Sequence, residues 1–334
     1  MAKTGGILLC AGFGSRLAPL TEVVPKPAIP FCGVPMAHYA RAALERAGVA
    51  EMGMNVHHLP ERMIEAMDGG RWMDRAREMH ISREEGGILG TGGGAARLAG
   101  MMPDCDRFVI YHGDVLCGAD ISEALESHIA SGAKVSLVVL PRPEAVRENV
   151  RQSLGMIGVV DHEIVCIRDW YKNDCIIEFS PRCFSGIHIV ERGVLEAIAD
   201  RGSVCLVTEV YREMLDRGEA IHACEPSGAV YFADVGTPAT YLSAQRACLR
   251  SREYGDGPGL PVLCEGKTLY DRGDPSVSFG AVNIGDQVRI EGNVCLNPGA
   301  SVSGDVSLQD EMVCAEGGIK PDGAWICGGA ARAR

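Results

Sequence analysis

The chain has 334 residues, of which 46% are hydrophobic and 23% are charged, a composition that excludes a disordered or fibrous protein. Its 44 acidic and 32 basic residues give a formal net charge of −12, so it lacks the broad positive field that grips a phosphate backbone. Nucleic acid is therefore not an expected partner.

The first 252 residues alternate apolar runs with helical patterns. The apolar run at 6–10 predicts a short buried strand, and further strands are expected at 52–56, 108–111 and 135–140. One helix is expected at about 35–47, ending at Gly48, and another begins where Thr237 can cap it and Pro238 suits its first turn. This alternation predicts an α/β fold with a Rossmann-like, mostly parallel sheet covered on both faces.

The composition changes after residue 252. Residues 253–280 are rich in glycine, proline and aspartate and are expected to form a linker. Over 281–334 small apolar residues recur every six positions, which predicts a short left-handed β-helix of hexapeptide repeats; an irregular β-rich tail is the alternative. The recurring positions are Val282, Val288, Val294, Ala300, Val306 and Met312.

The fourteen cysteines are scattered through apolar stretches, and no two of them have C-x-x-C spacing. This pattern disfavours both a disulfide framework and a zinc site. The amino terminus does not read as a signal peptide, and no apolar run approaches the ~18–20 residues that cross a bilayer. We therefore expect reduced, mostly buried thiols and a cytoplasmic protein with no membrane partner.

A glycine-rich turn follows the first predicted strand. Its residues are LCAGFGSRL at 9–17, with Pro-Lys-Pro at 25–27. Backbone N–H groups in such turns can point at phosphates. A dinucleotide fingerprint would need glycine where Leu17 stands, and a P-loop would need Gly-Lys-Ser/Thr, so both are excluded. Arg16 and Lys26 instead offer a phosphate chain two fixed positive charges.

This segment resembles the opening of the sugar-1-phosphate nucleotidyltransferases, also called nucleotide-sugar pyrophosphorylases. The resemblance extends from residue 5 to about 250, and a β-helix tail is a common appendage in the family. Four further stretches carry it. EEGGILGTGGG at 84–94 resembles the second nucleotide loop, YHGD at 111–114 the metal-binding GD motif, SGIH at 185–188 the segment bordering the sugar, and ADVGTP at 233–238 the family's D-x-G-T-P.

The resemblance implies an enzyme that joins an NTP to a sugar 1-phosphate and releases pyrophosphate, with Mg²⁺ as cofactor. The sugar phosphate is already anionic, so alignment and charge neutralisation suffice without a protein nucleophile. The implied catalytic residues are Arg16, Lys26 and Asp114, with Asp114 and Asp234 as metal ligands. The implied nucleotide-binding residues are Leu9, Ala11, Gly12, Gly14, Ser15, Glu84, Gly90, Thr91 and Gly92, and those toward the sugar phosphate are Gly186, Glu209 and Lys172.

The chain departs from the family pattern at one place. Many members carry Glu-Lys-Pro, whose lysine binds the sugar phosphate, whereas residues 167–172 here read IRDWYK. Arg168 or Lys172 is the expected substitute. Structural alternatives also exist for other motifs, since Asp114, Asp234 or Thr208-Glu209 can serve as helix caps. His57 and His58 are expected to be satisfied near a loop rather than catalytic.

The ILLCAG opening and the GTGGG loop are most similar to mannose-1-phosphate guanylyltransferase-like and N-acetylmuramate-1-phosphate uridylyltransferase-like members, and the first is the expected activity. The alternatives are N-acetylmuramate-1-phosphate uridylyltransferase and glucose-1-phosphate thymidylyl- or uridylyltransferase. A non-catalytic subunit that senses nucleotide-sugars is a different class of protein. Such a subunit would be expected to lose Arg16, Lys26 or one of the two aspartates, and all four residues are present. An acyltransferase is disfavoured because all nine histidines precede residue 223, outside the repeats. We expect a homo-oligomer, since stacked coils have faces that can pair between copies.

Overall fold

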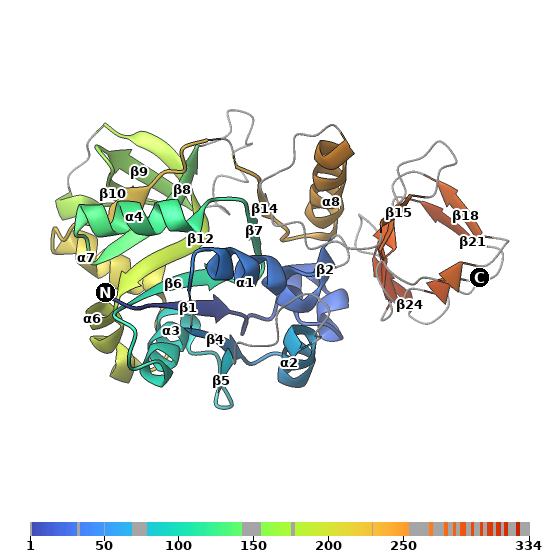
Figure 1. Cartoon of the computed structure of the whole chain (residues 1–334), viewed down its shortest axis with the longest axis horizontal. Coiled ribbons are helices and arrows are strands. Elements are labelled where there is room, and N and C mark those ends of the chain that lie inside the picture. The colour runs from blue at the N-terminus through green and yellow to red at the C-terminus, as the bar shows by residue number, and fades with distance from the viewer. Residues whose placement is uncertain are drawn as a thin grey trace. The chain divides into compact units, whose positions relative to one another are not determined.

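The computed structural model describes residues 2–31, 34–49, 51–68, 79–141, 155–174, 178–228 and 230–253, and short strands between 267 and 327 (Figure 1). The chain divides into two units. Unit 1 comprises Met1–Ala11, Ala40–His57 and Met73–Phe232, and unit 2 comprises Gly12–Tyr39, His58–Trp72 and Ala233–Arg334. No helix among the described residues is long and apolar enough to cross a membrane.

Unit 1 is built on a ten-stranded sheet. Its strand order is β11-β10-β13-β8-β12-β6-β1-β4-β5, with β9 beside β10 and β12. The strands are β1 (Thr4–Leu9), β4 (Glu51–Val56), β5 (Met79–Arg83), β6 (Arg107–His112), β8 (Val135–Pro141), β9 (Met156–Val160), β10 (Glu163–Ile167), β11 (Trp170–Tyr171), β12 (Ser180–Glu191) and β13 (His222–Cys224), and β7 (Val115–Cys117) lies outside this sheet.

The sheet is mixed, which corrects the expectation of a mostly parallel one. Strands β6, β1, β4 and β5 are parallel neighbours, as strand–helix alternation predicts. The long strand β12, however, runs antiparallel to both β6 and β8, and β10 is antiparallel to its neighbours β9, β11 and β13. The predicted strands all formed within one or two residues, but β12 was not predicted, and it supplies the antiparallel half.

Helices cover both faces of this sheet (Figure 1). One core packs α3 (Gly90–Met101), α6 (Arg192–Glu196) and α7 (Arg212–Asp216) against alternate residues of the strands, among them Ile7, Ile110 and Leu137. On the other face, α4 (Ile121–Ser131) packs on β8 and β13. The helix α1 (Met36–Arg46) brings Leu44 against β1, where a Cβ on Gly6 would be 3.0 Å from a Leu44 methyl. Strand alternation thus places one apolar set on each face.

Unit 2 contains short elements around the glycine-rich turn. Single 3-10 turns form at Ser15–Leu17, Leu20–Glu22 and Lys26–Ala28, followed by the hairpin of β2 (Pro30–Phe31) and β3 (Val34–Pro35) and later by α2 (Pro60–Asp68). The helix α8 (Pro238–Glu253) follows β14 (Phe232–Asp234) and begins as predicted. Thr237 Oγ1 accepts a hydrogen bond from Thr240 N at 3.2 Å, so Thr237 caps this helix.

Three parallel pairs of carboxyl-terminal strands share one offset, whereas Cys295 and Met312 pair in parallel 17 residues apart. Val277 pairs with Cys295, Asn283 with Ser301 and Val288 with Val306, all in parallel and 18 residues apart. The strands β15 (Lys267–Leu269) and β16 (Val277–Phe279) lie within the segment expected to be a linker, and Val282, Val294 and Ala300 lie outside the described residues. The remaining strands are β17 (Asn283–Ile284), β18 (Val288–Glu291), β19 (Cys295–Leu296), β20 (Ser301–Val302), β21 (Val306–Gln309), β22 (Met312–Cys314), β23 (Gly317–Ile319) and β24 (Trp325–Cys327).

Candidate active site

One edge of the unit 1 sheet gathers the carboxyl ends of its parallel strands. β1 ends at Leu9 and β6 at His112, and the backbone N–H of Gly113 donates to Leu9 O at 3.0 Å. Asp114, half-buried, lies beside Gly113 in the turn after β6, and this turn is hydrogen-bonded to the end of β1. Burial, and next the charge of Asp114, raise the pKa of the Cys10 thiol, so Cys10 stays protonated. Open parallel sheets bind ligands at this edge.

The GD turn and the predicted sugar segment lie together. In the antiparallel register of β12 with β6, Ile187 pairs with Tyr111 and His188 with Ile110. Gly186 has φ +83°, and an added Cβ there would be 3.0 Å from Val115 Cγ2. A side chain at Gly186 would therefore be strained and would press on the residue after Asp114. Two motifs that lie some seventy residues apart in sequence are thus brought to one place.

The second predicted nucleotide loop packs against residues 204–206. Gly92 N and Gly93 N both donate to Val204 O, at 2.8 and 3.3 Å, and Thr91 Oγ1 accepts from Leu206 N at 2.9 Å. These N–H groups at the start of α3 are therefore engaged within the protein. Gly90, the first residue of α3, is half-exposed beside them.

Glu84 does not reach into solvent. Its side chain is buried, with Oε1 accepting from Asn55 Nδ2 and Oε2 from Leu89 N, both at 2.8 Å. His57 Nδ1 lies 2.6 Å from Glu84 O, and in unit 2 His58 Nε2 lies 2.5 Å from Thr21 O. Both histidines are thus satisfied by backbone carbonyls, as the sequence favoured.

The predicted sugar-side residues have local partners. Glu209 Oε1 accepts from Cys205 N at 2.7 Å, which is the capping interaction that the sequence left open, and it opens a π-helical turn at Leu206–Tyr211. Lys172 forms an ion pair with Glu163. The guanidinium of Arg168 lies 5.8 Å from the centre of the Trp170 ring. Lys172 is thus paired with Glu163, and Arg168 lies over the ring of Trp170, so both cations have partners within unit 1.

Unit 2 brings the first loop together with two other motifs. Gly14 has φ +62°, and a Cβ there would be 2.8 Å from Lys26 Cβ, so only glycine fits this turn beside the buried Lys26. The exposed Arg16 lies over Gly236, where an added Cβ would be 3.0 Å from Arg16 Cζ. Asp234 is half-buried two residues earlier in the same segment. The turn residues Gly12 and Ser15 are exposed, while Leu9 and Ala11 belong to unit 1.

The charges in these two clusters suit phosphate chemistry. Unit 2 supplies the cations Arg16 and Lys26 with the carboxylate of Asp234, and unit 1 supplies Asp114. Among the described residues, no three His, Cys, Asp or Glu side chains form a metal-binding group. Mg²⁺ binds one or two carboxylates beside phosphate oxygens and water, so Asp114 in unit 1 and Asp234 in unit 2 are each side chains of the kind that it takes.

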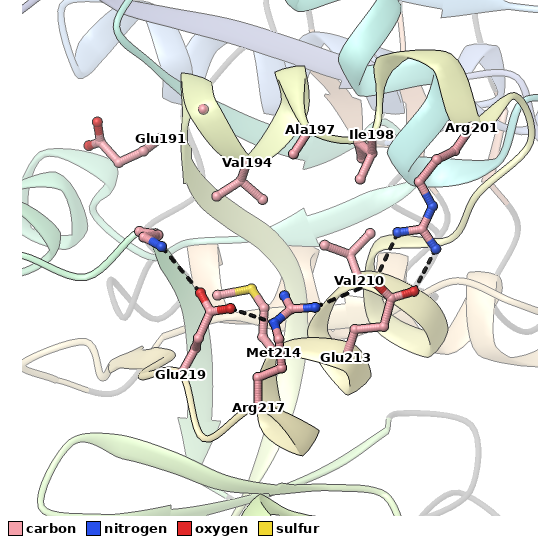
Figure 2. A pocket seen from close by; sticks show the side chains of 12 residues that line it. Glu191, Val194, Ala197, Ile198, Arg201, Val210, Glu213, Met214, Arg217 and Glu219 are labelled. Carbon is pink, nitrogen blue, oxygen red and sulfur yellow. Dashed lines mark hydrogen bonds and ion pairs between the residues drawn. The ribbon is translucent and has the colours of Figure 1, made fainter.

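A separate pocket of about 560 Å³ lies at the other end of the unit 1 strands (Figure 2). It includes Glu191, which pairs in register with Arg107, the first residue of β6, whereas Asp114 follows the last. Six residues of strand span roughly 20 Å. The apolar lining includes Val194, Ile198 and Met214, and the rim carries the ion pairs Arg201–Glu213, Arg217–Glu219 and Lys134–Glu219. Because the charged side chains at its rim are paired with one another, we assign this pocket no part in catalysis.

A buried histidine, His188, lies beside His112, the residue that precedes Gly113 and Asp114. His188 is fully buried, with Nδ1 2.8 Å from Tyr211 Oη and Nε2 3.3 Å from His112 Nε2. Burial, and next the neighbouring His112, hold the pKa of His188 well below its usual value. Burial also lowers the pKa of His128 and of His222. The folded protein therefore keeps neutral imidazoles that the unfolded chain would protonate.

We expect the free energy of unfolding to fall as the pH drops below ~6.5, where the unfolded histidines take up protons that the folded ones do not. Each such histidine contributes a slope of at most about 1.4 kcal/mol per pH unit. His188→Asn, which keeps a partner for Tyr211, should lower absolute stability and remove up to one histidine's share of the slope. Urea unfolding between pH 5 and 8 measures both; an unchanged slope in the variant would contradict the assignment.

Comparisons with known proteins show what the chain is similar to. The model of the nucleotidyl transferase family matches residues 5–165. The chain is 28% identical over 310 residues to a mannose-1-phosphate guanylyltransferase of Mycobacterium tuberculosis, covering 91% of this chain and 79% of that protein. It is 30% identical over 240 residues to a mannose-1-phosphate guanyltransferase of Schizosaccharomyces pombe, covering 71% of this chain and 62% of that one. The fold matches the crystal structure of HddC from Yersinia pseudotuberculosis with a TM-score of 0.58 at 18% identity, covering 73% of this chain and 98% of that one.

Proposed function

Because the chain belongs to the nucleotidyl transferase family, we propose that it is a sugar-1-phosphate nucleotidyltransferase, which joins an NTP to a sugar 1-phosphate and releases pyrophosphate. The observation that carries the proposal is the clustering in unit 2 of Arg16, Lys26 and the segment that holds Asp234. A tight turn alone requires no such cations. In unit 1 the GD turn and the sugar segment form the second cluster that this reaction needs.

In this reaction an oxygen of the sugar phosphate attacks the α-phosphorus of the NTP, and the bond to the pyrophosphate oxygen breaks. The attacking oxygen is already anionic, so no residue has to remove a proton. Catalysis therefore consists of alignment and neutralisation of charge. Arg16, with its forked guanidinium, would stabilise the departing pyrophosphate, and Lys26 would contact the attacking phosphate or the α-phosphate.

We further propose that Asp114 and Asp234 are the protein ligands of Mg²⁺. The support is the family resemblance and the donor chemistry, since both are half-buried carboxylates at the ends of strand segments. When bound, the ion would offset negative charge on the phosphates. Asp114, which follows β6, and Asp234, the last residue of β14, would hold the ion through their carboxylate oxygens.

The substrates proposed are GTP and mannose 1-phosphate, supported by the names of the two relatives and by the GTGGG loop. Uridylyl- or thymidylyltransfer to another sugar is the alternative. Lys172 and Arg168 are the candidate cations for the sugar phosphate, although Lys172 would have to leave Glu163 to serve. Pyrophosphate release across a matrix of NTPs and sugar 1-phosphates tests the proposal. If no substrate pair releases pyrophosphate, the result would instead favour a non-catalytic sensor of nucleotide-sugars.

We propose that the segment from about 281 onward is a left-handed β-helix that holds copies of the chain together. Three of the carboxyl-terminal parallel strand pairs have an 18-residue offset, which equals three hexapeptides, the length of one three-sided coil, and the pair Cys295–Met312 is offset by 17. The paired stretches would then stack as successive coils.

Truncation after Glu253 is expected to change the oligomeric mass while leaving transferase activity, because the tail carries no histidine and no implied site residue. Light scattering coupled to size-exclusion chromatography measures the mass, with the full chain as control. A truncated protein that stays folded and keeps its oligomeric state, yet loses all activity, would contradict this proposal.

A further inference from the structure

A buried chain of hydrogen bonds connects three segments of unit 1 near the edge that carries Asp114. Cys10 N donates to Asn55 Oδ1, Asn55 Nδ2 donates to Glu84 Oε1, and Leu89 N donates to Glu84 Oε2, each at 2.8 Å. Asn55 and Glu84 are both only 2% exposed. The chain thus runs without interruption from the residue after β1 to the residue before α3.

The strand register explains how one side chain spans this distance. Asn55 lies on β4, the strand between β1 and β5, where it pairs with Leu9 on one side and Ser82 on the other. Its amide therefore lies between the residues that leave both neighbouring strands, Cys10 and Glu84. No other described strand lies between these two loops.

The pair is expensive to bury, which makes its presence informative. A carboxylate and an amide at 2% exposure cost free energy unless their polar atoms are hydrogen-bonded. Here the three bonds use both Glu84 oxygens. They also give the backbone N–H groups of Cys10 and Leu89 an acceptor, which these groups would otherwise lack. The helix α3 also packs on the pair, since a Cβ on Gly94 would be 2.6 Å from Asn55 Nδ2.

We infer that Asn55 and Glu84 form a positioning pair that sets the spacing between the loop after β1 and the loop before α3, and thereby the affinity for the nucleotide. This inference rests on the proposed function, because it takes those two loops as the unit 1 part of the NTP site. Glu84 then acts through Leu89, and Asn55 acts through Cys10. Neither side chain has to touch the nucleotide.

The polarity of the chain permits a test by exchange. Asn55→Asp places two carboxylates at hydrogen-bond distance, and Glu84→Gln leaves one donor facing another, so each single variant breaks one link. In the double variant N55D/E84Q, the carboxylate introduced at position 55 can accept from both Cys10 N and the amide introduced at position 84. The oxygen of that amide can accept from Leu89 N. All three bonds are restored with the charge moved to the other partner.

Each single variant is expected to raise the KM for the NTP by ~10- to 100-fold, the range for a lost hydrogen bond to a charged group. The KM for the sugar 1-phosphate should change less than about threefold, and the double variant should recover the NTP KM to within about threefold of the wild type. Glu126→Gln, an exposed change on α4, is the control for loss of a carboxylate alone. Thermal unfolding of every variant separates loss of fold from loss of positioning.

Folded single variants with a wild-type NTP KM would overturn the inference, as would a double variant no better than the singles. If neither single variant folds, the double variant decides, since only restored bonds return both the fold and the NTP KM. The Kd of GTP measured by calorimetry keeps the test separate from the proposed function. A wild-type chain that binds GTP without transfer refutes the transferase while the Kd of the variants still tests the pair, and a chain that binds no NTP refutes both.

Discussion

Replacing Arg16 with alanine is expected to lower kcat by ~10²–10³ while leaving the KM for the sugar 1-phosphate nearly unchanged. The exposed guanidinium of Arg16 lies over Gly236 in unit 2. Arg16 itself belongs to the turn in which Gly14 adopts the left-handed conformation. A cation held there meets negative charge that grows on pyrophosphate only as the bond to the α-phosphorus breaks. Loss of one such preorganised contact typically costs this much in rate.

Two further variants separate this role from general charge effects. Arg16→Lys keeps the positive charge and loses the forked geometry, so it should recover only part of the rate. Arg62→Ala removes an exposed arginine from α2 of the same unit and should leave kcat within about twofold. Steady-state kinetics with both substrates varied gives the comparison. A near-normal kcat for Arg16→Ala would remove this residue from the mechanism.

The fold was predictable where its determinants are local. Strands such as β1, β4, β6 and β8 are mostly apolar runs, and α8 begins at a Thr-Pro pair that both caps and starts it. The mixed character of the sheet was not predictable in this way. Whether β12 lies antiparallel between β6 and β8 depends on pairing partners far away in sequence, and no periodicity within 180–191 encodes the direction of a neighbour.

The candidate site shows the same division. Motifs with unusual residue combinations, such as the turn with Gly14 and Arg16, directly indicated the residues that we propose bind phosphate. Asn55 was missed, although a polar residue inside the apolar strand EMGMNV is a signal that a buried partner exists. Glu84 was noticed, but its burial behind the loop follows only from the position of β4 between β1 and β5.

Replacing Asp114 or Asp234 with asparagine is expected to reduce kcat by about 10²-fold or more and to raise the Mg²⁺ concentration needed for half-maximal rate. Each change keeps the shape of the side chain and removes one charge. Because both side chains are only half-buried, the fold should persist in each variant. Metal ions supply several kcal/mol of charge stabilisation in such reactions, which sets the size of the effect. Asp200→Asn, an exposed change in unit 1, is the matched control.

The double variant tests whether the two aspartates act through one ion. If each held its own metal or merely stabilised its own unit, the losses in kcat would multiply, because independent effects add in free energy. If both hold the same Mg²⁺, the first substitution already forfeits most of what the ion supplies, and the second can cost little more. We therefore expect the double variant to lose much less activity than the product of the single losses. Losses that multiply, or a rate that chelator leaves unchanged, would refute a shared ion.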